Sequence, residues 1–144
     1  MTPPSTSAST SPTALDRGNL EDWELITIEV DQTELLVAVA DDPGERAQGL
    51  MGVEDLGSVD GMLFVFPSDT TGFFWMKDTL IALDIAFFAS DGLLVEVMTM
   101  EPCVSDPCPR YQAGVSYRWA LETAAGDLAD LSETARLTFP LANP

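Results

Sequence analysis

The chain has 144 residues, the length of one domain built around a single hydrophobic core. Asp and Glu number 24 against 6 Lys and Arg, and the resulting formal net charge of -18 repels nucleic-acid phosphates and anionic lipids. Histidine is absent, which excludes Ser-His and Cys-His catalytic pairs and the commonest metal ligand. We therefore expect no nucleic-acid partner, and any catalysis has to use carboxylates, tyrosine, cysteine or the single lysine, Lys77.

The first 20 residues are predicted to be a disordered tail, and residues 21–144 a single globular domain. Residues 1–14 contain 11 Ser, Thr or Pro residues, so they cannot bury enough apolar surface to fold. No apolar run resembles a signal peptide or a membrane span. A tether of this composition is typical of an exported protein whose signal or lipid-anchor segment has been removed, with Met1 added afterwards. The alternative is an ordinary disordered terminus of a cytoplasmic protein.

Alternating apolar residues predict two strands near the start of the domain, over 24–30 and 33–40. The short Asp31-Gln32 connection between them predicts a hairpin. Asp42 and Pro43 then supply an N-cap and a first-turn proline for a short helix that Gly49 or Gly52 should end.

The rest of the chain reads mostly as further strands. The apolar run 61–66 predicts a strand buried on both faces, and residues 73–77 are another strand candidate. A turn at 90–92 joins predicted strands over 83–88 and 93–100 into a second hairpin. Residues 117–122 and 135–139 are strand-like, and the alanines of 124–131 predict a helix. Many short strands with one or two short helices predict a mainly β (α+β) fold, an antiparallel sheet curled into a partial barrel.

Cys103 and Cys108 lie in a loop that three prolines, at 102, 107 and 109, keep out of helix and sheet. We expect a disulfide, which would persist only in an oxidising compartment. The alternative is a free or metal-bound dithiol, although the spacing is not the C-x-x-C of redox and zinc sites.

Five blocks follow one another along the chain with an ordered pattern of residue types. They are Arg46 with Gly49, Leu50 and Met51; Gly61 to Phe64 with Phe66; Phe74 to Lys77 with Thr79 to Ile81, Leu83 and Asp84; Pro102, Cys103, Cys108 and Tyr111; and Trp119 to Glu122. Together they resemble the signature of domain of unknown function 192, also called uncharacterised protein family 0127. The resemblance spans residues 37–139 and implies membership of a family to which no function is attached.

The chain departs from this family pattern at two positions. Asp78 stands where the family usually has Asn, and Ala82 where it has Pro. The first change adds a negative charge beside Lys77, which weakens the case for an anion site at that spot. The second loosens a turn.

The candidate site is centred on residues 73–84, where aromatics, Lys77 and two carboxylates crowd together. Lys77 can clamp a ligand beside Trp75, or can form a structural ion pair, for which Asp78 and Asp84 are near in sequence. Asp84 opens an apolar strand, where a carboxylate either bonds to backbone N–H groups or acts as a proton-transfer group. The full set of ligand-binding candidates is Arg46, Trp75, Lys77, Asp78, Thr79, Asp84 and Glu122.

Three functional hypotheses follow. The first is a non-catalytic module outside the cytoplasm that binds a small ligand or an envelope component near Trp75. The second is a hydrolase that uses Asp84 with Glu122 or Asp78 as acid and base. The third is a Cu(I) or redox protein that uses the cysteines and the motif-proximal methionines, which are Met51, Met62, Met76, Met98 and Met100. Most methionines will simply fill the core, so we expect no metal and no cofactor. The aspartates do not match a calcium loop.

Overall fold

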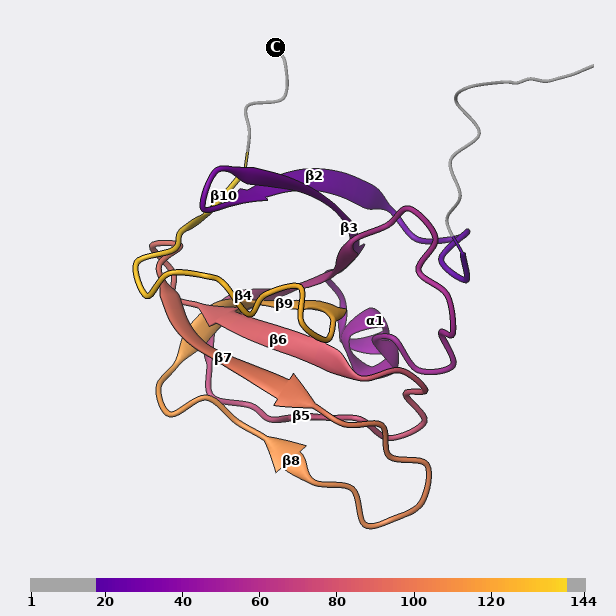
Figure 1. Cartoon of the computed structure of the whole chain (residues 1–144). Coiled ribbons are helices and arrows are strands. Elements are labelled where there is room, and N and C mark those ends of the chain that lie inside the picture. The colour runs from indigo at the N-terminus through magenta and orange to yellow at the C-terminus, as the bar shows by residue number, and fades with distance from the viewer. Residues whose placement is uncertain (1–17, 140–144) are drawn as a thin grey trace, which may run out of the picture.

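The computed structural model describes residues 18–139, which form one curled seven-stranded sheet and a small two-stranded sheet (Figure 1). The strand order in the large sheet is β10-β2-β3-β4-β9-β6-β7. Every neighbouring pair is antiparallel except β3 and β4, which run parallel. The curled sheet forms a half-barrel, and the predicted fold class is confirmed.

The first hairpin pairs β2 (Leu25–Val30) with β3 (Thr33–Ala40), as predicted. Asp31 and Gln32 both have positive φ angles, 54° and 73°, the conformation of the tight turn whose twist matches a hairpin. The chain then enters α1 (Pro43–Gln48), where the Asp42 side chain accepts a hydrogen bond from the Glu45 N–H at 2.8 Å. Helix α1 therefore begins where the N-cap signal placed it, and it ends at Gly49.

The centre of the sheet is formed by β4 (Gly61–Thr70), β9 (Tyr117–Ala124) and β6 (Leu83–Phe88), and β7 (Leu94–Met100) completes the second predicted hairpin. Strand β4 is longer than predicted, because a register irregularity between Val65 and Thr70 lets it continue past Pro67. Strand β6 is buried along its whole length, since both faces of the sheet are covered.

Two hydrophobic clusters lie on opposite faces of the sheet, because successive side chains of a strand alternate between faces. The first cluster includes Phe64 and Phe87 and lies on the side of α1 and the two-stranded sheet (Figure 1). The second includes Leu63 and Phe88 and lies under the curled β2–β3 hairpin and the segment from 125 to 137. Any two neighbouring residues on a central strand therefore belong to different environments.

The two-stranded sheet pairs β5 (Phe74–Trp75) with β8 (Arg110–Tyr111). The strand predicted over 73–77 is therefore limited to two residues, and β8 was not predicted from the sequence. Neither segment has the length of a typical strand or the alternation of apolar and polar residues that predicts one. They pair because the tertiary fold places the two segments side by side.

The helix predicted over 124–131 is wrong: Ala124 ends strand β9, and residues 125–130 form consecutive turns. Gly126 has a positive φ of 97°, and the N–H groups of Gly126 and Leu128 donate to the Asp84 carboxylate instead of to helix carbonyls. The last strand, β10 (Leu137–Thr138), is shorter than the predicted run 135–139 and pairs with β2.

The packed domain begins before residue 21. The Leu20 side chain is fully buried in the first cluster, and the Asn19 side chain accepts hydrogen bonds from the N–H groups of Glu54 and Asp55 at 2.9 and 3.0 Å. The rest of the predicted tail, residues 1–17, lies outside the described residues, as do residues 140–144. Among the helices within 18–139, none is long and apolar enough to cross a membrane.

Candidate functional site

A pocket of about 450 Å³ opens on the first face of the sheet, between α1, β4, β9 and the segment 72–75. A volume of this size suits a small organic ligand. Seven of its lining residues are aromatic or basic: Arg46, Phe64, Phe66, Phe73, Phe74, Trp75 and Tyr117.

The aromatic walls hold one another in edge-to-face contacts. The Phe74 ring lies 5.0 Å from the Phe64 ring, and the Phe66 and Tyr117 ring centroids are 5.6 Å apart. Tyr117 is buried, which raises its pKa to about 12, and its hydroxyl donates to the Gly72 carbonyl at 2.7 Å. The walls are thus preformed, while Phe73 and Trp75 remain 43% and 39% exposed at the mouth.

Glu122 is the acidic residue of the pocket. It lies on β9 opposite Met62 of β4 and Ile85 of β6, and only 4% of its surface is exposed. Burial raises the pKa of its carboxyl group to about 8, so the group is mostly protonated at neutral pH. Within residues 18–139 no side-chain hydrogen bond or ion pair reaches this carboxyl group. A buried polar group without a partner is rare and calls for an explanation.

Arg46 reaches the pocket from α1. Its Nη1 donates to the Val65 carbonyl at 2.9 Å, and its guanidinium lies 5.1 Å from the centroid of the Phe66 ring. These two contacts fix the plane of the group and leave most of its five N–H donors for another partner. Arg46, one of the candidate site residues, thus lies against an aromatic ring of the pocket and forms no ion pair within the described chain.

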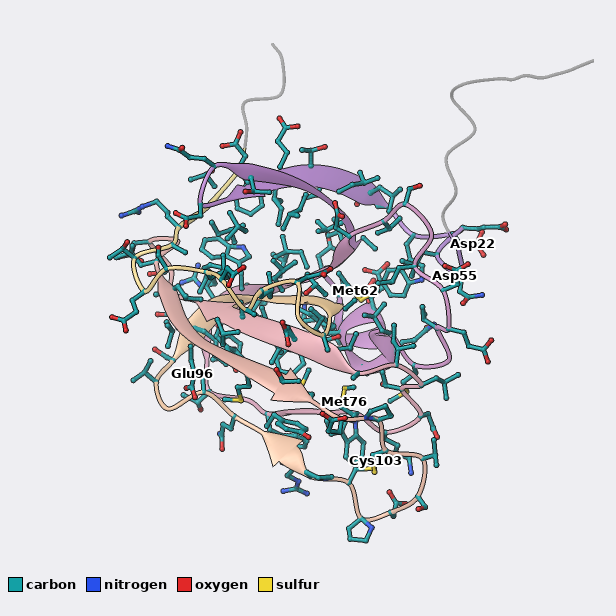
Figure 2. All side chains as sticks on the ribbon, in the orientation of Figure 1. Asp22, Asp55, Met62, Met76, Glu96 and Cys103 are labelled. Atoms are coloured by element: carbon teal, nitrogen blue, oxygen red, sulfur yellow. A yellow bond between two sulfur atoms is a disulfide. The ribbon has the colours of Figure 1, made fainter. Side chains whose placement is uncertain are left out.

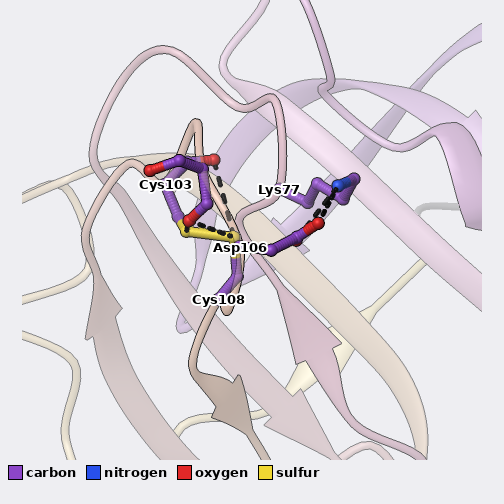
Figure 3. A network of polar contacts seen from close by, with 5 residues as sticks. Lys77, Cys103, Asp106 and Cys108 are labelled. Atoms are coloured by element: carbon purple, nitrogen blue, oxygen red, sulfur yellow. Dashed lines mark hydrogen bonds and ion pairs between the residues drawn. A yellow bond between two sulfur atoms is a disulfide. The ribbon is translucent and has the colours of Figure 1, made fainter.

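Lys77 forms the predicted ion pair, but with a different partner. Its Nζ lies 3.0 Å from both carboxylate oxygens of Asp106, in the cysteine loop (Figure 3), and within the described chain it forms no ion pair with Asp78 or Asp84. The hydrogen bond and the charge of Asp106 raise the Lys77 pKa. Nζ also lies 5.9 Å from the Trp75 ring centroid. Lys77 does not line the pocket, and its charge is matched beside it.

Asp78 and Thr79 have separate roles in the turn that follows. Asp78 has a positive φ of 57°. Asn and Asp tolerate this conformation better than most residues, which explains why the family usually has Asn at this position. The Asp78 side chain is exposed. Thr79 is buried, lines the pocket, and donates to the Lys77 carbonyl at 3.4 Å.

Asp84 is a structural residue on the other face of the sheet. Cross-strand partners share a face, so Glu122 points the same way as Ile85, and Asp84 points the opposite way. The buried Asp84 carboxylate accepts from the Thr99 hydroxyl at 2.8 Å and from the N–H groups of Gly126 and Leu128 at 2.9 and 3.1 Å. The prediction that Asp84 and Glu122 act together as acid and base is therefore wrong, because the two carboxyl groups lie on opposite faces of the sheet.

The disulfide between Cys103 and Cys108 is present, as predicted (Figure 3). The Cys103 carbonyl accepts from the Asp78 N–H at 2.9 Å, which attaches the loop to the end of the 73–78 segment. The same loop carries Asp106 to Lys77. Through these two contacts the cysteine loop holds in place the segment whose residues 73–75 line the pocket.

The methionines are mostly core residues. Met62, Met76 and Met100 are buried in the first cluster, and Figure 2 shows Met62 and Met76 within the molecule. One group of three carboxylates, Asp41, Asp42 and Glu45, lies close together among the described residues, and its hydrogen bonds to backbone N–H groups cap α1.

Sequence reasoning missed several pocket residues. Tyr117 was read only as the start of a strand, and Phe66 and Phe74 only as parts of the family pattern. Asp106 was not considered as the partner of Lys77. The repeated aromatics of 61–66 and 73–75 were the available signal, but aromatic runs of this kind are equally typical of an ordinary core.

Fold and site together define a small half-barrel β domain with an aromatic pocket on one face of the sheet. The family model of DUF192, described as "Uncharacterized ACR, COG1430", matches residues 26–138, and the chain belongs to this family. No curated protein is significantly similar to the chain.

Two solved structures share the fold. A Sinorhizobium meliloti 1021 protein described as a "putative transcription regulator" is 28% identical, with a TM-score of 0.72, covering 80% of this chain and 93% of its own. A protein of unknown function from Novosphingobium aromaticivorans DSM 12444 is 22% identical, with a TM-score of 0.73, covering 91% of each chain. The second likeness shows the fold alone.

Proposed function

We propose that this protein is a non-catalytic module that binds a small organic ligand, or a small component of the cell envelope, in the aromatic pocket. The observation that carries the proposal is the Glu122 carboxyl group, 4% exposed and without a polar partner in the described chain, at the lining of a preformed cavity. A polar group in this position lowers stability unless something binds to it. A ligand with a hydrogen-bonding group would supply the missing partner.

The pocket lacks the equipment for hydrolysis by paired carboxylates. Glu122 is the one Asp or Glu residue among its described lining residues, and Asp84 lies on the opposite face. Glycoside hydrolysis with general acid and base needs a second carboxylate across the same cleft. Binding without turnover is the activity that these residues support best.

We place the protein outside the cytoplasm, either secreted or held by an N-terminal anchor. The support is the Cys103–Cys108 disulfide, since such bonds persist in oxidising compartments. To test this placement, free thiols are alkylated during cell lysis and the mass of the intact protein is measured by mass spectrometry. Alkylation of both cysteines would refute the placement outside the cytoplasm.

Transcription regulation, suggested by the description of the Sinorhizobium meliloti relative, is not proposed for this chain. A net charge of -18 opposes contact with DNA phosphates, and DNA binding normally depends on a basic surface.

The binding proposal is tested by titrating a panel of small aromatic and alicyclic compounds into the labelled protein and following backbone amide signals by NMR. We expect hits that shift amides of residues 46–51 and 72–75 together. Phe73→Ala should weaken these hits, because Phe73 stands at the pocket mouth. Phe139→Ala is the matched control, since Phe139 is similarly exposed, at 45% against 43%, and its ring centroid lies 5.8 Å from that of Trp119, against 6.0 Å between Phe73 and Trp75. Shifts scattered over the surface, or equal effects of the two variants, would refute the proposal.

A further inference from the structure

The basic side chains of this acidic protein gather around one site. Five of the six Lys and Arg residues lie within residues 18–139. Three of these five sit against aromatic rings that line the pocket: Arg46 against Phe66 at 5.1 Å, Lys77 against Trp75 at 5.9 Å and Arg110 against Phe73 at 4.5 Å. Their positive charges offset part of the strongly negative charge of the chain around the pocket mouth.

Two of these cations lack a matching carboxylate. Ion pairs within the described chain join Lys77 to Asp106 and Arg118 to Asp69. Neither Arg46 nor Arg110 forms an ion pair there, although the protein has 24 acidic residues that could provide one. The Arg46 guanidinium is held in place by the Val65 carbonyl and the Phe66 ring, so it is preorganised to donate hydrogen bonds to two oxygens of an oxyanion.

Arg46 and Glu122, the basic and the acidic residue of the pocket lining, contact strand β4 at different points along its length. Arg46 donates a hydrogen bond to the carbonyl of Val65 on β4. Glu122 lies opposite Met62, which precedes Val65 by three residues on the same strand. At about 3.3 Å per residue, the two anchor points are roughly 10 Å apart along the strand. The aromatic walls lie in the same pocket, so it has a cationic region, an apolar body and a buried carboxyl group.

We propose that the ligand is a small amphipathic anion, with a flat apolar or aromatic body and one carboxylate, sulfonate or phosphate group. Arg46 binds the anionic group. The rings of Phe66, Phe74 and Trp75 contact the body, and the far end of the ligand exchanges a hydrogen bond with Glu122. This assignment rests on the proposed binding function and adds the charge of the ligand to it. It places the anion at Arg46 rather than at Lys77, whose charge Asp106 already matches.

Two dyes with the same aromatic body separate the charge of the ligand from its shape. Anilinonaphthalene sulfonate carries one sulfonate, and phenylnaphthylamine has the same ring system without it. We expect the sulfonate dye to bind with one-to-one stoichiometry and about 10- to 100-fold more tightly, the contribution of charge-assisted hydrogen bonds to a preorganised group. Fluorescence titration of the folded protein at fixed ionic strength measures both affinities.

Arg46→Gln should remove this preference and bring the two affinities within about threefold of each other. Arg118→Gln is the matched control, because it removes the same charge from a residue that pairs with Asp69 and does not line the pocket. Arg110→Gln provides a second test at the mouth, with a smaller loss expected for the sulfonate dye. Circular dichroism shows whether each variant is folded.

Equal binding of the two dyes, or a preference that survives both Arg46→Gln and Arg110→Gln, would overturn the anion assignment while leaving the binding function intact. Binding of neither dye would overturn the assignment, and the absence of hits in the wider compound panel would refute the binding function as well. A loss of preference in Arg118→Gln equal to that in Arg46→Gln would show that the overall field, not the pocket, selects the anion, and would also overturn the assignment.

Discussion

Replacing the Glu122 carboxyl group by an amide, Glu122→Gln, should stabilise the protein at neutral and alkaline pH. Burial raises the pKa of Glu122 from 4.5 to about 8. Between these values the unfolded chain has released the proton and the folded chain still holds it. Because the unfolded state then binds fewer protons, stability falls as pH rises from about 4.5 to 8 and is level above that.

The size of this loss of stability follows from the difference between the pKa values of Glu122 in the unfolded and folded states. Each pH unit of difference in pKa corresponds to about 1.4 kcal/mol. The rise of the Glu122 pKa from 4.5 to about 8 therefore lowers the free energy of unfolding by about 5 kcal/mol above pH 8 and by about 3 kcal/mol at pH 7. Glutamine has the same shape and no proton to lose, so Glu122→Gln should abolish this part of the pH dependence.

Urea unfolding at pH 5 and at pH 8.5, followed by circular dichroism at constant ionic strength, measures the effect. The difference between wild type and Glu122→Gln isolates Glu122 from the general repulsion of so acidic a chain. Glu133→Gln is the control, because Glu133 is exposed and the variant removes the same formal charge. If wild type and Glu122→Gln showed the same pH dependence, the carboxyl group would be solvated or paired in the folded state, and the central observation behind the binding proposal would be lost.

Three further changes test the structural roles of residues outside the pocket. Asp84→Ala should cost about 3 to 5 kcal/mol in urea unfolding, because three donors lose a buried charged acceptor; Asp84→Asn, which keeps an oxygen acceptor, should cost less, and equal costs would contradict this account. The double variant Cys103→Ser/Cys108→Ser should lower stability by about 2 kcal/mol, the entropy of closing so short a loop, with reduced wild type as the comparison. Leu20→Ala should cost about 2 to 5 kcal/mol because Leu20 is fully buried, whereas a cost near zero would restore the tail boundary at residue 20.

Local signals predicted the regular elements well. Period-two alternation identified β2 and β3, the Asp42-Pro43 pair identified the start of α1, and the turn at Asp91-Gly92 identified the second hairpin. Each of these features depends on residues that are close in sequence. The helix predicted over 124–131 was wrong for the complementary reason: alanine propensity is a small local preference, and hydrogen bonds to Asp84, some 40 residues earlier, override it.

The structure brings only some of the candidate site residues together. The sequence placed the candidate site at residues 73–84, and Arg46, Trp75, Thr79 and Glu122 do line one pocket. The sequence could not show that Asp84 belongs to the opposite face from Glu122. That distinction depends on the register between β6 and β9, and a slip of one residue would reverse it.

The sequence by itself determined the composition-dependent properties of this protein: a strongly negative chain without histidine, a mostly β domain, one short capped helix and a loop closed by two cysteines. Tertiary structure alone decided which groups meet. It paired Lys77 with Asp106, assigned Asp84 to the turns after β9, and left Glu122 and Arg46 in one aromatic pocket. The reason is physical: alternation along a strand gives each side chain a face, but only the packing of strands distant in sequence decides what that face contains.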